Sequence, residues 1–156
     1  MIPIRDVIPS RTTPVVTVSL IVFNLLVFLF QSSLSERGLA LLLSNFALVP
    51  AEFSIVTVFT AMFLHAGLAH LAGNMLFLWI FGDNIEDRLG HGRFVWFYVI
   101  CGFAAAFAQT ALNPDSTVPM VGASGAIAGV MGAYLVLFPH SRIVMLFPFQ
   151  IGRAHV

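Results

Sequence analysis

Ser124 is the only serine in a stretch that otherwise holds apolar or very small residues, MVGASGAIAGVMGAY (120–134). Gly122 and Gly125 flank it closely, so we expect it at a turn-to-helix junction where another backbone can approach the hydroxyl. A serine hydroxyl becomes a nucleophile when a general base takes its proton. The same small residues also favour close helix packing, with Ser124 as one more small side chain. The glycines that would form a narrow packing groove on this helix are Gly125, Gly129 and Gly132.

Two histidines and an asparagine interrupt a second apolar segment, HAGLAHLAGNM (65–75). On a helix His70 and Asn74 share one face, whereas His65 lies about 140° away from His70 and joins them only if the helix is distorted. Both His70 and Asn74 can donate hydrogen bonds, and two donors beside a nucleophile suit a developing oxyanion. The alternative is that these polar residues only tie neighbouring spans together.

A metal site is disfavoured by the spacing of these histidines. His65 and His70 do not share a helix face, and no cysteine or acidic ligand lies close to them in the sequence. We therefore expect no metal and no other cofactor.

The chain of 156 residues is too apolar to be covered by a polar surface. Hydrophobic residues make up 59% of it and charged residues 9%, against about 25% charged residues in soluble domains. We therefore expect lipid as the solvent and a multi-pass integral membrane protein as the class. The sequence has no lysine and zero formal net charge, which argues against a nucleic-acid partner.

Four apolar segments, with their flanks, are expected to cross a bilayer as helices. They cover residues 15–30, 55–81, 94–113 and 121–138, and a further apolar piece begins near residue 143. Residues 39–46 predict an interfacial helix, and the charge-dense segment 82–93 predicts a water-exposed turn. The first segment could instead be a cleaved signal peptide, but no small-x-small cleavage site follows it. The predicted fold is all-α, a polytopic membrane bundle with four complete spans and a stub of the fifth.

The arginines predict which way this bundle faces. With the N-terminus in the cytoplasm and alternating spans, only Arg37 falls outside. The arginines on the cytoplasmic side are then Arg5, Arg11, Arg88, Arg93 and Arg142. This is the positive-inside distribution. It places Ser124, His70 and Asn74 at one depth in the outer half of the bilayer, although they come from distant segments.

The two polar signals occur together in a recognisable order. The strings HAGLAHLAGNM (65–75), FGDNIEDRLG (81–90) and GASGAIAGVMGAY (122–134) follow one another along the chain. With the opening MIPIRDVIPSRTTP, this pattern resembles the rhomboid family of intramembrane serine proteases. The resemblance covers nearly the whole chain, and H-x4-H-x3-N on the second span followed by G-x-S-G on the fourth is specific.

The resemblance implies a role for each residue. Ser124 matches the catalytic nucleophile, His70 and Asn74 match oxyanion-stabilising side chains, and His65 matches a supporting histidine of the same cavity. Glu86 and Arg88 match a turn that is structural in the family. The implied activity is metal-free cleavage of transmembrane protein substrates near the outer membrane face. The short loops and the resemblance to a minimal six-span rhomboid suggest a bacterial inner membrane.

The sequence departs from the family pattern at the general base. In rhomboids this base is a histidine on a sixth span, which packs against the glycine groove of the fourth. No such span is present, and His91 and His140 are expected on the cytoplasmic side. We therefore expect a truncated, inactive protease with its groove left open. The alternatives are a non-catalytic rhomboid-like protein that binds transmembrane helices, and a small transporter or channel, which the lack of an intramembrane carboxylate disfavours.

The last residues differ in character from the apolar piece before them. QIGRAHV (150–156) carries an arginine far too early for a span of about 20 residues. One back-translation of this string, followed by a stop codon, spells the start of a widely used sequencing adapter. We therefore expect residues 1–149 to be an incomplete rhomboid-like membrane domain and residues 150–156 to be a non-native tail. Resequencing the locus across codon 150 tests this expectation.

Overall fold

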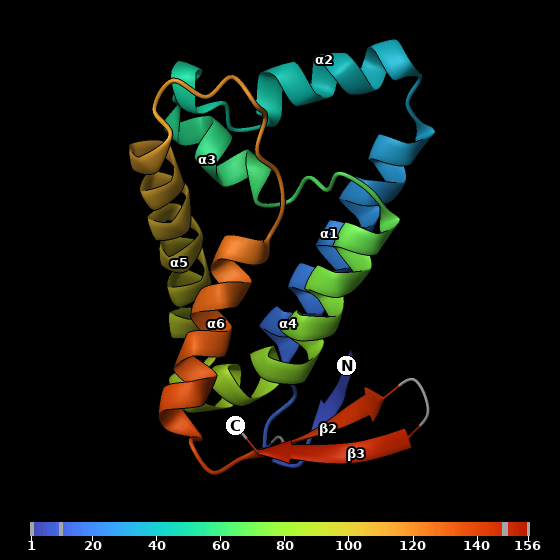
Figure 1. Ribbon diagram of the computed structural model, residues 1–156, viewed down its shortest axis with the longest axis vertical. Helices are drawn as coiled ribbons and strands as arrows, with labels where there is room; N and C mark the ends of the chain where they lie inside the picture. The colour runs from blue at the N-terminus through green and yellow to red at the C-terminus, as the bar shows by residue number, and fades with distance from the viewer. Residues whose placement is uncertain (1, 10, 148–149, 156) are drawn as a thin grey trace.

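The computed structural model describes residues 2–9, 11–147 and 150–155, and most of them are helical (Figure 1). The helices are α1 (Val15–Ser33), α2 (Glu36–Phe46), α3 (Ile55–Ala61), α4 (Leu68–Leu89), α5 (His91–Leu112) and α6 (Ser124–Leu137), with a 3₁₀-helix η1 (Pro50–Glu52). The strands are β1 (Ile2–Asp6), β2 (Arg142–Phe147) and β3 (Gln150–His155). Figure 1 shows α1, α4, α5 and α6 running alongside one another, with α2 across one end and the sheet at the other.

Helix α4 holds the bundle together because it packs against α1, α5 and α6. The largest buried side chains of the core include Phe94 and Tyr98 on α5 and Tyr134 on α6. Ile85 and Leu78 on α4 have no exposed surface and lie among them. The core therefore sits where α4, α5 and α6 meet, and it extends to Ala123 and Ala126 beside Ser124.

Two helices among the described residues are both long and apolar enough to cross a membrane, α1 and α5. They agree with the predicted spans at 15–30 and 94–113. Both expose large apolar side chains, such as Leu29 at 64% and Trp96 at 69%. Helix α6 is apolar but shorter. The predicted interfacial segment at 39–46 also forms a helix, α2, whose N-terminus is capped by the Ser35 hydroxyl.

The predicted second span is not one continuous helix. Helix α3 ends at Ala61, and α4 begins only at Leu68. The carbonyl oxygen of Ala61 accepts a hydrogen bond from the Gly122 N–H at 2.8 Å. The backbone of His65 exchanges two bonds with the side chain of Gln31 on α1, at 3.1 and 3.2 Å. These tertiary bonds replace the helical ones and explain the break.

The prediction of an exposed turn at 82–93 holds only near Gly90, where the chain turns and residues 90–93 are exposed. It is wrong for residues 82–89, because α4 continues to Leu89 before α5 begins at His91. Glu86, in the middle of this segment, is only 1% exposed. Its carboxylate accepts hydrogen bonds from the N–H groups of Val16 and Thr17, at 2.9 and 2.8 Å, and from the Thr17 hydroxyl at 2.7 Å. Because α1 has no side-chain cap of its own, the Glu86 carboxylate satisfies the free N–H groups at its start.

Replacing Glu86 with alanine should destabilise the bundle strongly. The substitution leaves two backbone N–H groups and a hydroxyl buried without partners, so we expect the free energy of unfolding to fall by about 2–5 kcal/mol. Unfolding in mixed detergent micelles, followed by circular dichroism, measures this loss. The matched control is Asp87→Ala, because the Asp87 carboxylate binds Arg11 and Thr12 at an exposed position. Equal losses in the two variants would contradict the capping role of Glu86.

The prediction that a fifth helical span begins near residue 143 is wrong as well. Residues 142–147 form β2, which pairs antiparallel with β1 and with β3 in the order β1-β2-β3. Pro139 and Pro148 bound this short segment and disfavour a helix, while Ile143 and Val144 favour a strand. Strand β3 contains residues 150–155 of the predicted non-native tail, and Val156 lies outside the described residues. Their pairing describes how they fold and does not test their origin.

The N-terminal strand is tied to the helices through Asp6. Its carboxylate accepts hydrogen bonds from Asn84 Nδ2 at 2.8 Å and from the Tyr134 hydroxyl at 3.0 Å. Burial raises the pKa of the Asp6 carboxyl above its ordinary value. The sheet is thereby joined to α4 and α6 at the end of the bundle opposite Ser124.

Candidate functional site

Ser124 is the first residue of α6, at the turn-to-helix junction that its glycine neighbours predict. The segment before it is held in place by backbone bonds. Met120 and Leu48 form an antiparallel bridge with bonds of 2.8 and 3.1 Å, and the Gly122 N–H donates to Ala61. Gly122 has a φ of 121°, which residues with a side chain rarely adopt. Together these contacts fix where the exposed Ser124 hydroxyl points.

The His70 and Asn74 side chains pack against this same segment. A Cβ atom added to Gly122 would lie 2.6 Å from His70 Cε1, 2.8 Å from His70 Nε2 and 3.7 Å from Asn74 Nδ2. A Cβ at this position, two residues before Ser124, would overlap the His70 ring and touch Asn74 at an ordinary contact distance. The structure thus brings the motif of α4 and the motif of α6 together from about 50 residues apart in sequence.

Two side chains of this site, Asn74 and His65, are buried and have unused hydrogen-bonding capacity. Asn74 is 6% exposed, and its Nδ2 has no hydrogen-bond partner among the described residues. His65 is 2% exposed, and within the same part of the chain neither ring nitrogen has a partner. Its ring lies 5.2 Å from that of His70, centroid to centroid, at an angle of 64°. The break between α3 and α4 supplies the distortion that His65 needs to join His70.

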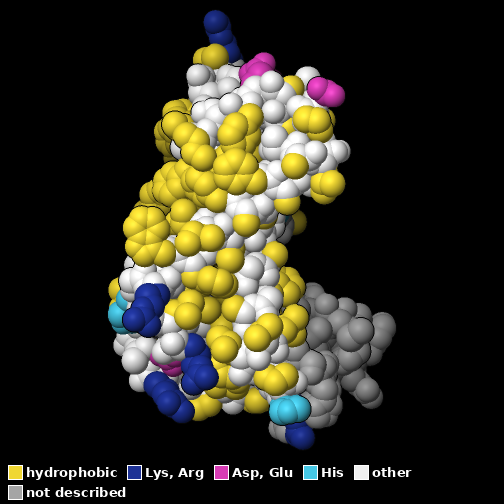
Figure 2. All heavy atoms as spheres, turned by 90° about the vertical axis from the view of Figure 1, so that its left-hand side faces the viewer, with side chains coloured by type: hydrophobic (Ala, Val, Ile, Leu, Met, Phe, Trp, Pro, Cys, Tyr) yellow, Lys and Arg dark blue, Asp and Glu magenta, His cyan; other side chains and the backbone are white. Residues whose placement is uncertain are grey.

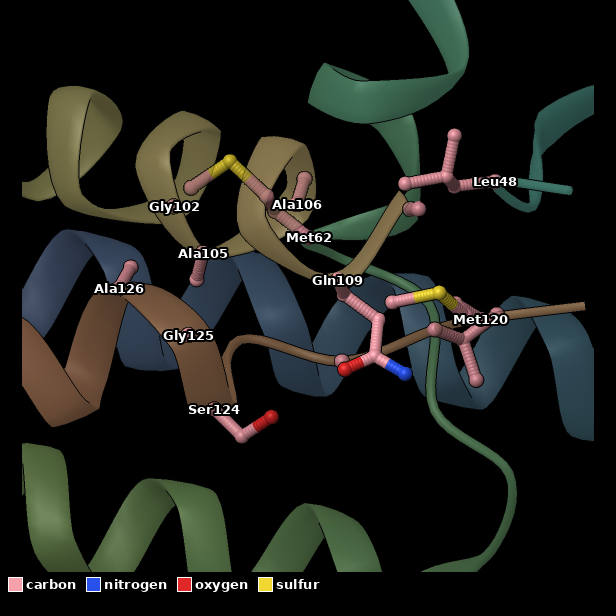
Figure 3. A pocket seen from close by; sticks show the side chains of 13 residues that line it. Leu48, Met62, Gly102, Ala105, Ala106, Gln109, Met120, Ser124, Gly125 and Ala126 are labelled. Carbon is pink, nitrogen blue, oxygen red and sulfur yellow. The ribbon is translucent and has the colours of Figure 1, made fainter. Parts of the chain in front are cut away.

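A cavity of about 220 Å³ opens beside Ser124. Figure 3 shows the Ser124 hydroxyl at its edge, on the side that faces α4, and the side chain of Gln109 reaching toward it from α5. Apart from these groups the lining is apolar or small, and it includes Met62, Ala105 and Met120. The cavity can therefore hold a small side chain next to the hydroxyl.

The glycine groove on α6 is mostly filled by α5. A Cβ added to Gly125 would lie 2.6 Å from the Cβ of Ala105, and one added to Gly129 would meet the side chain of Cys101. The expectation of an open groove is thus wrong at these two positions, because the small residues of α5 and α6 let both backbones approach closely. Of the three groove glycines, only Gly132 has no atom within 4 Å of an added Cβ.

No other described histidine side chain is positioned to act on Ser124. His91 Nδ1 lies 2.5 Å from Glu86 Oε1 at the opposite end of the bundle, and His140 follows the far end of α6. Among the described residues, no three His, Cys, Asp or Glu side chains form a group that could hold a metal. The arrangement provides a hydroxyl and hydrogen-bond donors, and the chemistry it suits is attack on a polarised carbonyl.

Comparison with known proteins gives the same family that the sequence motifs resemble. Residues 52–155 match the rhomboid domain. The chain is 40% identical over 87 residues to "Rhomboid protease GluP" of Bacillus subtilis, a match covering 56% of this chain and 17% of that protein. It is 36% identical over 102 residues to the mitochondrial "Rhomboid protein 1" of Saccharomyces cerevisiae, covering 63% and 29%. It is 34% identical over 113 residues to "Rhomboid-like protein 11, chloroplastic" of Arabidopsis thaliana, covering 71% and 38%.

The chain therefore belongs to the rhomboid family, as its motifs predict, and it is a membrane protein. Its matches span less than two fifths of the length of these three relatives. Their names include both a protease and rhomboid-like proteins.

The sequence analysis did not single out Gln109 or the packing role of Gly122. A signal for Gln109 is present, since a polar side chain within an apolar span is costly and usually has a function. For Gly122 the sequence offers no such signal, because its importance depends on the His70 and Asn74 side chains that it contacts only in the folded chain.

Proposed function

We propose that this chain carries the nucleophile and the oxyanion donors of an intramembrane serine endopeptidase that cleaves transmembrane proteins near the outer membrane face. The observation that carries the proposal is the packing of His70 and Asn74 against Gly122, two residues before Ser124. The unpartnered Nδ2 of Asn74 adds to it. A buried free donor is costly as mere packing and useful where negative charge develops.

The proposed reaction begins with Ser124. Its Oγ attacks the scissile carbonyl carbon as a base removes the hydroxyl proton, and the carbonyl oxygen becomes the oxyanion of a tetrahedral intermediate. The Ser124 backbone N–H, in the first turn of α6, is one donor to that oxyanion. His70 and Asn74 supply the others. The amine then leaves with a proton, and water hydrolyses the acyl-enzyme to regenerate the hydroxyl.

We propose that the general base comes from a segment outside these 156 residues. The described histidines near the site are His65 and His70, and the proposal assigns them to support and to oxyanion binding. We call this chain, together with a following segment that supplies a base histidine, the completed chain. In that protein the added histidine would lie beside Ser124 Oγ.

The proposal includes a topology. The four spans would be α1, α3 with α4, α5 and α6, with the N-terminus and most arginines in the cytoplasm. The relatives come from a bacterium, from mitochondria and from chloroplasts. Family membership therefore gives a membrane but no single compartment, and the bacterial inner membrane stays a prediction.

A competing function is that of a rhomboid-like protein that binds transmembrane helices without cutting them. It is favoured by one observation. Among the described histidines, those near Ser124 are His65 and His70, and the proposal already assigns both to roles other than the base. The two functions differ in a cleavage assay. The completed chain and the 156-residue chain are each reconstituted in liposomes with a single-span substrate that carries small residues near its outer end. We expect cleavage by the completed chain and none by the shorter one.

The outcomes of this assay separate the functions clearly. No cleavage by a folded completed chain, with retained binding of the substrate helix, would support the binding protein instead. Ser124-dependent cleavage by the 156 residues alone would refute the assignment of the base to a further segment.

Gly122→Ala should disrupt the site in the completed chain. The added methyl group would overlap the His70 ring and strain a φ of 121°. A displacement of about 1 Å can lower a rate about 10²-fold, so we expect at least that loss in kcat/KM. The control is Gly132→Ala on the same segment, where an added Cβ meets nothing. Similar activity of both variants would show that His70 and Asn74 do not depend on Gly122.

A further inference from the structure

An apolar groove on the outside of the bundle shares no lining residue with the Ser124 cavity. It has a volume of about 660 Å³ and is lined by side chains of α1, of α5 and of the α3 region. One part of it is formed by Phe23, Phe59 and Phe63, whose rings pack edge to face at 5.0 and 5.3 Å. Its other end holds Ser19 and the largely exposed Trp96.

The polar end of the groove coincides with the arginine-rich end of the bundle. Glu86 contacts both Val16 and His91, so α1 and α5 begin side by side there. Arg93 lies in the first turn of α5, three residues before Trp96, and the two side chains share a helix face. Figure 2, which views the molecule from the left-hand side of Figure 1, shows hydrophobic side chains over the middle of this face and arginines gathered below them.

The guanidinium group of Arg93 is available to bind an anion. Among the described residues Arg93 forms no ion pair with a carboxylate, and Arg88 contacts the ring of Phe138. The nearby acids are already engaged, since Glu86 caps α1 and Asp87 accepts bonds from Arg11 and Thr12. An anion beside Trp96 therefore meets the guanidinium group of Arg93, which pairs with no carboxylate among the described residues.

We propose that this groove binds one anionic phospholipid. An acyl chain lies along the aromatic part of the groove, and the phosphate lies at Arg93, with Trp96 at the level of the headgroups. Arg93 beside the groove, then Ser19 and Trp96 in its lining, and then the phenylalanine rings follow the order of groups in such a lipid. Charge complementarity selects an anionic headgroup, because basic pockets between spanning helices bind anionic lipids. The proposal does not depend on the protease activity.

Native mass spectrometry of the 156-residue chain tests the proposal. The protein is released from detergent micelles that contain equal amounts of phosphatidylglycerol and phosphatidylcholine with identical acyl chains. We expect one phosphatidylglycerol to be retained in preference. Arg93→Gln should lower that preference about five-fold, as one basic group near an anionic headgroup implies, and Arg93→Lys should largely keep it. The charge control is Arg37→Gln, on α2 at the opposite end, which should change nothing.

A second pair of variants tests the groove itself. Ser19→Trp fills it, whereas Val22→Trp adds the same ring on the same helix at a position outside the lining. Both native side chains are exposed, so both variants should fold. We expect lost retention of the lipid in the first variant only. The proposal is overturned by equal retention of the two lipids, by equal effects of Arg37→Gln and Arg93→Gln, or by unchanged retention in Ser19→Trp.

Discussion

Replacing Ser124 with alanine in the completed chain is expected to lower kcat by a factor of at least about 10⁴. Loss of a serine nucleophile removes the covalent pathway, and the measured cost in serine proteases reaches about 10⁶. The Ser124 side chain is exposed at the start of α6, so its removal should leave the fold intact. Cleavage of a reconstituted single-span substrate, quantified by gel, measures the rate.

Controls for this variant separate chemistry from stability. The unfolding midpoint in detergent should match that of the parent, and the substrate should still bind. Ser44→Ala, which removes an exposed hydroxyl on α2 that bonds only to its own helix, should retain full activity. Cleavage by Ser124→Ala at more than a few per cent of the parent rate would assign the reaction to another residue.

Truncating either oxyanion donor is expected to produce the second largest effect. Asn74→Ala or His70→Ala should lower kcat about 10²–10³-fold while KM changes little, because the lost bonds form mainly in the transition state. The double variant should cost less than the product of the two single effects if both groups bind one oxygen. Steady-state kinetics on a soluble or detergent-dispersed substrate gives both parameters.

A structural role for these residues predicts a different pattern. If His70 and Asn74 only tie α4 to α6, their loss should lower the unfolding midpoint and leave kcat unchanged. Asn24→Ala provides the comparison, since Asn24 is a fully buried asparagine on α1 that donates to Leu20 of the same helix. We expect Asn24→Ala to affect stability alone. Unchanged kcat in both His70→Ala and Asn74→Ala would contradict oxyanion binding by these side chains.

Much of the bundle is predictable from local sequence because a helix that crosses lipid needs a long apolar segment. Helices α1 and α5 follow from the long apolar segments 15–30 and 94–113, which carry no charge. Ser124 begins α6 because Gly122 precedes a helical run. The sharing of one face by His70 and Asn74 follows from their four-residue spacing. These features depend on residues that are near one another in the chain.

The features that the sequence did not predict depend on distant partners. Hydropathy cannot reveal that Ala61 bonds to Gly122, and so it predicts one helix where α3 and α4 are separate. It also treats Glu86 as a solvated charge, although the start of α1 surrounds that carboxylate with donors. The partner of Gly125 is α5, whose Ala105 becomes significant only when the two helices pack.

The central claim is that Ser124 is a nucleophile activated within the site formed by α4 and α6. Labelling by a fluorophosphonate tests it most directly, because this reagent reacts with activated serines and the modified residue can be located by mass spectrometry of peptides. In the completed chain we expect one adduct, on Ser124, that is absent in Ser124→Ala and strongly reduced when the base histidine is replaced. Labelling of a different residue, or cleavage of the substrate by a protein in which Ser124 stays unmodified, would contradict the account.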